Sequence, residues 1–130
     1  MREESASWWQ QAIEDLHTAE MLAEAGRHYA CAFFCQQAAE KAVKALFIER
    51  QRQPAPPTHT LPTLGQAVGA SSPLMSALRR LNLAYVTTRY PDAANGIPAQ
   101  MYDEETSTMH LADARQVVAW VREHLEWETG

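Results

Sequence analysis

The sequence predicts an all-α fold, an up-and-down bundle of four main helices plus one short helix. Apolar residues recur three and four positions apart in successive segments, which is the spacing of one buried helix face. No segment shows the alternation of apolar and polar residues that a half-buried strand requires. Only Arg27 and His28 separate the first two expected helices, and so short a connection makes neighbouring helices run antiparallel.

The length and charge of the chain limit its class. A chain of 130 residues is the size of one domain, so we expect residues 1–130 to form a single helical domain. The net charge of −5 argues against unaided nucleic-acid binding, because that affinity depends on Lys and Arg displacing phosphate counterions. The first residues carry no apolar signal segment, and no apolar run is long enough to span a bilayer. We therefore expect a cytoplasmic protein without membrane contact.

The first helix is expected to begin at Ser7. Ser7 and Gln10 have the spacing of a capping box, and Gly26 is typical of a helix end. Between them runs a single apolar stripe, which consists of Trp9, Ala12, Ile13, Leu16, Ala19, Leu22 and Ala23.

The second helix is expected from about Tyr29 to Arg52, because Pro54 and the prolines that follow it cannot continue a helix. Glu40 and Lys44 stand four residues apart within it, which favours a surface ion pair.

Two further helices should follow a proline-rich loop. Residues 61–68 have one short apolar face that Gly69 ends, which predicts a helix of two turns. Ser72, followed by Pro73, is typical of a helix start, and that helix should end before Pro91.

The last helix is expected after a loop. Residues 90–101 are rich in Pro, Asn and Gly, which is loop chemistry. Asp103 should cap the final helix, whose apolar stripe consists of Leu111, Ala114, Val118, Val121 and Leu125.

Cys31 and Cys35 lie four residues apart on one face of the second helix. Helix geometry holds such side chains apart, so we expect two reduced, buried thiols rather than a disulfide. A structural zinc ion needs about four ligands, and His28 would be only a weak third one. We therefore expect neither a metal nor another cofactor.

Arg89, Tyr90 and Asp92 are the strongest candidates for ligand or partner contact. They place a guanidinium, a phenol and a carboxylate where a helix gives way to a loop, and binding residues concentrate in such loops. The alternative is an ion pair of Arg89 with Asp92 that only closes the helix end.

Lys41 and Lys44 could also hold a phosphate or an acidic group of a partner, although charged residues on the outer face of a helix are usually only solvated. Gln37 lies in an otherwise apolar, alanine-rich segment. A buried amide needs partners, so we expect it to bond Asp15 across the first two helices.

Two histidines are possible proton carriers. His59 precedes the short helix, where its ring could equally wedge the loop, and His110 lies in a segment that could approach Arg89. Trp8 and Trp127 fall beside the apolar stripes near the chain ends. Exposed aromatic side chains mark interfaces, so together with the alanine-lined second helix they suggest a homodimer.

Four blocks of the sequence resemble the HEPN family of small helical proteins. They are Trp9 with Asp15, Leu16 and Ala19; the string F-x-x-Q-Q-A-A-E-K-A-x-K-A-L of residues 33–46; Thr58-His59-Thr60-Leu61; and Tyr85 with Thr88-Arg89-Tyr90-Pro91-Asp92. The resemblance implies a bundle of four to five helices that is commonly dimeric. It also implies an association with a minimal nucleotidyltransferase, often as the toxin half of a toxin–antitoxin pair.

Catalytically active members of that family resemble one another in an R-x4-6-H motif that cuts RNA without a metal. No histidine stands at the matching distance after Arg79, Arg80 or Arg89. Asn and Gly, which follow Arg89, cannot move protons near neutral pH, so no catalytic residue is assigned.

We therefore expect a homodimeric HEPN-like binding module that pairs with a nucleotidyltransferase-type protein and contacts a nucleotide phosphate through Arg89. One alternative is an RNase toxin in which His59 or His110 replaces the missing imidazole. Another is a purely structural helical dimerisation module.

Overall fold

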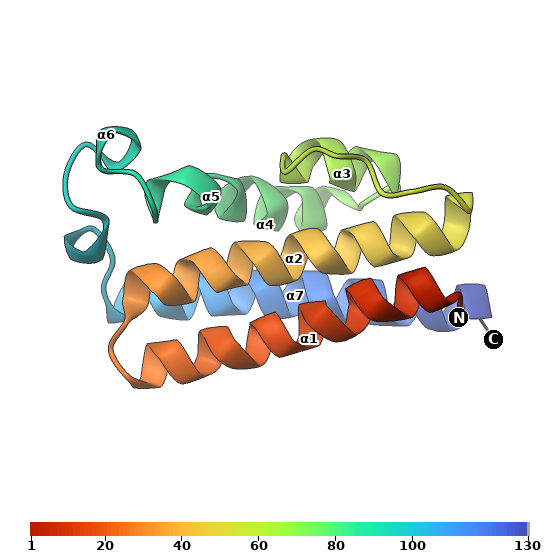
Figure 1. Ribbon diagram of the computed structural model, residues 1–130, viewed down its shortest axis with the longest axis horizontal. Coiled ribbons are helices and arrows are strands. Elements are labelled where there is room, and N and C mark those ends of the chain that lie inside the picture. The colour runs from red at the N-terminus through yellow and green to blue at the C-terminus, as the bar shows by residue number, and fades with distance from the viewer. Residues whose placement is uncertain (130) are drawn as a thin grey trace.

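The computed structural model describes residues 1–129, and its long helices run in alternating directions. Figure 1 shows α1, α2, the α4–α5 arm and α7 side by side, with both chain termini at one end of the bundle. No strand occurs within residues 1–129, so the predicted all-α, up-and-down bundle is confirmed. The elements are α1 (Glu3–Glu24), α2 (His28–Gln51), α3 (Leu61–Ala67), α4 (Ser72–Asn82), α5 (Ala84–Thr87), α6 (Pro91–Ala94), the 3-10 helix η1 (Pro98–Gln100) and α7 (Glu104–Thr129).

Helix α2 is the centre of the bundle. It packs against α1 and α7 and also contacts α3, α4 and α5. Its alanines Ala38, Ala39, Ala42 and Ala45 are fully buried, and their small side chains let neighbouring backbones approach closely. They belong to the interior of one chain, so they cannot form the dimer face that the sequence suggested.

The helix starts differ from those expected by a few residues. Helix α1 begins at Glu3, and Ser7 lies inside it with its hydroxyl donating to the Glu3 carbonyl. The capping box at Ser7 is therefore wrong; acidic residues in the first turn suit the helix dipole without it. Ser71, one residue before the predicted Ser72, caps α4 by accepting from the Leu74 amide.

The cap of α7 at Asp103 is confirmed. Its carboxylate accepts from the Thr106 amide at 2.9 Å, and the Thr106 hydroxyl accepts from the Asp103 amide at 2.8 Å. These reciprocal bonds satisfy two amides in the turn that opens α7.

The helix expected from residue 72 to residue 90 is interrupted. Helix α4 ends at Asn82, Leu83 joins it to α5, and the Asn82 side chain accepts from the amide of Leu61 at 2.9 Å. The predicted loop of residues 90–101 contains α6 and η1. Helix α5 contacts α2.

Both cysteines are fully buried free thiols, as predicted. A hydrogen bond with Cys35 holds the pKa of Cys31 below its ordinary value, whereas the same bond and burial raise the pKa of Cys35. Trp127 is 66% exposed, but Trp8 is partly covered, with the Lys44 ammonium 5.3 Å from the centre of its ring. Within residues 1–129 no helix is both long enough and apolar enough to cross a membrane.

Candidate functional site

Arg89 follows α5 and lies among three aromatic rings. Its Nε donates to the carbonyl oxygen of Tyr85 at 2.6 Å. The central carbon of the guanidinium lies 4.2 Å from the ring centre of Tyr85, 4.8 Å from that of Tyr90 and 5.4 Å from that of Phe33. Cation–π contacts of this kind hold a guanidinium in place without neutralising it.

Arg89 has no carboxylate partner within residues 1–129, so the ion pair with Asp92 that was an alternative does not form there. Its side chain is exposed, and only its Nε makes a hydrogen bond in that part of the chain. Asp92 lies in the first turn of α6, where a negative charge suits the helix dipole. The two Nη groups of Arg89 can therefore bind an incoming anion.

A buried carboxylate lies beneath this region. Glu40 on α2 accepts from Gln36 Nε2 at 3.1 Å, from Lys44 Nζ at 3.0 Å and from His59 Nδ1 at 3.0 Å. Burial raises the pKa of the Glu40 carboxyl, but these three bonds outweigh it and hold the pKa below its ordinary value. The Glu40–Lys44 pair forms as predicted, but both side chains are buried, so placing the pair on the surface was wrong.

Lys41 makes the cross-helix link that was expected of Gln37. Its Nζ lies 2.6 Å from Asp15 Oδ2 on α1 and 3.0 Å from Gln37 Oε1. Gln37 in turn donates to Gln36 at 2.7 Å, which joins this link to Glu40. A direct bond between Gln37 and Asp15 is therefore wrong, because the ammonium lies between them. Each lysine already has a carboxylate, which leaves both poorly placed to bind a phosphate.

His59 brings the buried carboxylate and Arg89 into one cluster. Its ring stacks on Tyr85 with 4.4 Å between the ring centres, and the Arg89 guanidinium contacts the same tyrosine. A carboxylate only accepts hydrogen bonds, so His59 Nδ1 carries the hydrogen that Glu40 receives. The neutral ring then has a lone pair on Nε2, and the side chain is 49% exposed.

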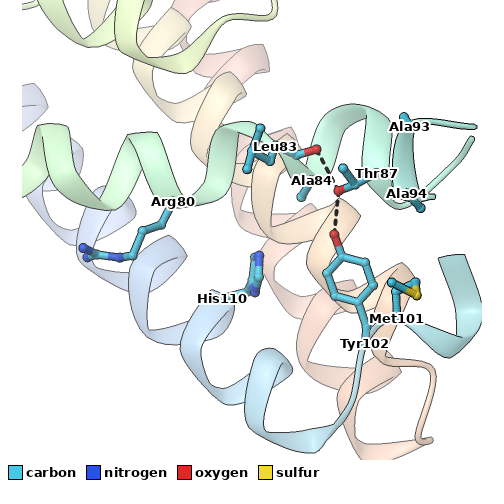
Figure 2. Close-up of a pocket in the computed structure, with 9 residues that line it drawn as sticks. All are labelled: Arg80, Leu83, Ala84, Thr87, Ala93, Ala94, Met101, Tyr102 and His110. Carbon is cyan, nitrogen blue, oxygen red and sulfur yellow. Dashed lines mark hydrogen bonds between the residues drawn. The ribbon is translucent and has the colours of Figure 1, made fainter. Parts of the chain in front are cut away.

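His110 lies apart from this cluster. Figure 2 shows it rising from α7 into a pocket between α5, α6 and α7, where Arg80 and Tyr102 also line the wall. Arg89 does not line that pocket. Arg80 donates two hydrogen bonds to the Asp113 carboxylate, from Nε at 2.9 Å and from Nη2 at 2.8 Å.

Sequence reasoning missed Phe33 and the role of Glu40. Phe33 reads as one more apolar position, and Glu40 as one more surface charge. Both residues belong to the block 33–46 that resembles the HEPN family, and that resemblance was the sequence feature that could have marked them as part of a site. Within residues 1–129 no group of three or more His, Cys, Asp or Glu side chains is arranged to hold a metal ion.

Replacing Glu40 with Gln should destabilise the protein by about 3 kcal/mol at pH 7, because it leaves the buried Lys44 ammonium without a counter-charge. The folded-state pKa of Glu40 is lowered, so its contribution is present above the ordinary value of 4.5 and is lost as the pH falls through the folded value. Urea unfolding from pH 7 to pH 3 should show the two proteins converging in acid. Glu128→Gln, at the more exposed pair with Arg50, is the control and should change stability by less than about 0.5 kcal/mol. Equal unfolding midpoints for wild type and Glu40→Gln at pH 7 would contradict this role.

The bundle and its motifs can be compared with known proteins. The sequence matches the HEPN domain over residues 5–124. The crystal structure of TT1696 from Thermus thermophilus is similar, with a TM-score of 0.86 and 29% identity, over 95% of this chain and 99% of that one. ST0689, an archaeal HEPN homologue, is similar with a TM-score of 0.81 and 26% identity, over 94% of this chain and 98% of that one. No curated protein shows significant similarity. Because the HEPN match spans nearly the whole bundle, the chain belongs to the HEPN domain family.

Proposed function

We propose that this HEPN domain is a binding module whose Arg89 holds the phosphate of a nucleotide and which pairs with a nucleotidyltransferase-type protein. The observation that carries the proposal is the state of Arg89. It is exposed, it is fixed by Tyr85, and within residues 1–129 it has no carboxylate partner. A guanidinium with both Nη groups available presents the fork that binds a phosphate through two parallel bonds.

The surroundings of Arg89 suit a nucleotide better than inorganic phosphate alone. Tyr90 is 48% exposed beside the guanidinium, so its ring offers a face on which a base can stack. Lys41 and Lys44 contribute little, because Asp15 and Glu40 already neutralise them.

Exposed apolar side chains support a role in protein contact. Five of them lie between residues 83 and 101, the segment that also carries Arg89, and such concentration favours an interface. We assign the homodimer contact to the part of this segment around Ile97, whereas Tyr90, beside Arg89, is assigned to the nucleotide. The five residues are Leu83, Val86, Tyr90, Ile97 and Met101.

A second candidate function, a metal-independent RNase toxin, is favoured by the Glu40–His59 pair. The carboxylate fixes Nδ1 of His59, which leaves Nε2 of the neutral ring able to accept a proton, and Arg89 contacts the same tyrosine as His59. General acid–base catalysis needs a positioned group of this kind. The acidic net charge, and the lack of a histidine at the R-x4-6-H distance after Arg79, Arg80 or Arg89, rank this function below the binding module, although Arg52 and His59 do have that spacing.

Arg89→Lys should weaken binding of a non-hydrolysable ATP analogue by about tenfold, because lysine keeps the charge but loses the fork and the ring contacts. Isothermal titration calorimetry measures the affinity, and thermal unfolding checks that the fold persists. Arg79→Lys is the matched control, since Arg79 is exposed and makes no ion pair within residues 1–129. Equal affinities of wild type and Arg89→Lys, or no binding by wild type at millimolar nucleotide, would refute the phosphate site.

The protein should be a dimer of twice the 14.6 kDa chain mass in light scattering over a wide concentration range. Ile97→Glu should shift it toward the monomer, because a buried unpaired carboxylate disfavours an apolar interface. Met21→Glu places the same charge at a residue of α1 that is 69% exposed and should leave the dimer intact. A monomer mass for wild type at every concentration would exclude the dimer.

The purified protein, without metal, should not cleave RNA above background. The assay incubates structured and unstructured RNA with wild type, His59→Ala and His110→Ala. Cleavage by wild type that disappears in His59→Ala but persists in His110→Ala would instead establish the RNase, with His59 as the proton carrier, because only His59 shares a cluster with Arg89.

A further inference from the structure

The pocket between α5, α6 and α7 that contains His110 is separate from the cluster around Arg89. Its volume is about 330 Å³, at the small end of the range for ligand sites. Apolar side chains make up one part of the lining: Leu83, Ala84, Ala93, Ala94 and Met101. Thr87, Tyr102, His110 and Arg80 supply the polar part (Figure 2).

The two hydroxyl groups of the pocket have no hydrogen left to donate. The Thr87 hydroxyl donates to the carbonyl oxygen of Leu83 at 2.8 Å, since a carbonyl can only accept. Thr87 Oγ1 lies 2.6 Å from the Tyr102 hydroxyl, and Thr87 has no second hydrogen. The Tyr102 hydroxyl must therefore be the donor in that bond. Figure 2 shows this relay across the pocket.

His110 is the polar group with unused capacity. Its Nδ1 donates to the carbonyl oxygen of Thr106 at 2.8 Å, so the neutral ring has its lone pair on Nε2. Nε2 makes no hydrogen bond within residues 1–129. Two of the three guanidinium nitrogens of Arg80 are committed to Asp113. The pocket thus combines apolar walls with one vacant acceptor.

We propose that this pocket binds a small, flat, uncharged heterocycle that donates an N–H hydrogen bond to Nε2 of His110. The three alanines leave room for a flat body, and the Met101 thioether favours contact with an aromatic ring. Nε2 of the neutral His110 ring accepts rather than donates, and the Thr87 and Tyr102 hydroxyls have no free hydrogen. Among these polar side chains an anion could find donors only on the Arg80 guanidinium, which points away from His110 in Figure 2. The site does not depend on phosphate binding at Arg89, because Arg89 does not line this pocket.

Indole and 1-methylindole form the decisive probe pair, because they share a flat apolar body and differ in the N–H donor. NMR titration of the full chain should show both probes shifting the signals of His110, Tyr102 and Met101. Indole should bind about fivefold more tightly, which is the effect of one net hydrogen bond. No shift of these signals at millimolar indole would overturn the proposal. Equal affinities for the two probes would show that the pocket binds them by apolar contact alone and would refute the hydrogen bond to His110.

Variants separate the acceptor from the cavity. His110→Phe should make the two affinities equal, whereas His17→Phe, at an exposed position of α1, should preserve the difference. Ala94→Leu fills the pocket from α6 and should weaken both probes by at least about fivefold, while Ala119→Leu on the exposed face of α7 should not. Ala94→Leu keeps the test valid if His110→Phe fails to fold. Undiminished binding of both probes to folded Ala94→Leu would place them elsewhere and overturn the site.

Discussion

The carboxylate of Glu40 is the interaction on which the arrangement of the site depends. It lies buried in the central helix, where a lone charge would be strongly destabilising. Gln36 and Lys44, one turn before and after it on α2, and His59, from the segment before α3, satisfy it together. Because His59 also stacks on Tyr85, the carboxylate ties α2 to α5. Arg89 contacts Tyr85, Tyr85 stacks on His59, and His59 is bonded to Glu40, so a buried charge on another helix helps to position Arg89.

The same charge explains the polar residues of the alanine-rich helix. A helix covered by neighbours on most sides needs small residues for close packing, and any polar residue in it needs a partner. Gln36, Gln37 and Lys41 meet this need by linking Glu40 to Asp15 on α1 through successive hydrogen bonds. Removing one member leaves the next unsatisfied, so the polar residues of this segment act as one unit.

Much of the fold follows from the sequence, because apolar spacing, prolines and the Asp103 cap depend on local chemistry. The cap at Ser7 and the unbroken helix to residue 90 were wrong, since Glu3 and Leu83 carry no strong local signal. For the site, Arg89 could be singled out as a cation at a helix end. Lys44 is buried, and His59 rather than His110 contacts the same tyrosine ring as Arg89. Both facts depend on packing between distant segments, which the spacing of apolar residues does not encode.

The distribution of charge favours a small anion over a polyanion. Lys41, Lys44 and Arg80 are each held by a carboxylate, whereas Arg89 has none within residues 1–129. At contact distance the attraction of a phosphate to the unpaired guanidinium outweighs repulsion by the net negative charge, because the guanidinium can form direct, charge-assisted bonds with the phosphate. Beyond about 8 Å screening is strong, and a long polyanion would also meet the acidic remainder of a chain with a net charge of −5. The proposed nucleotide site therefore rests on direct bonds from one guanidinium, whereas affinity for a nucleic-acid backbone requires several cations.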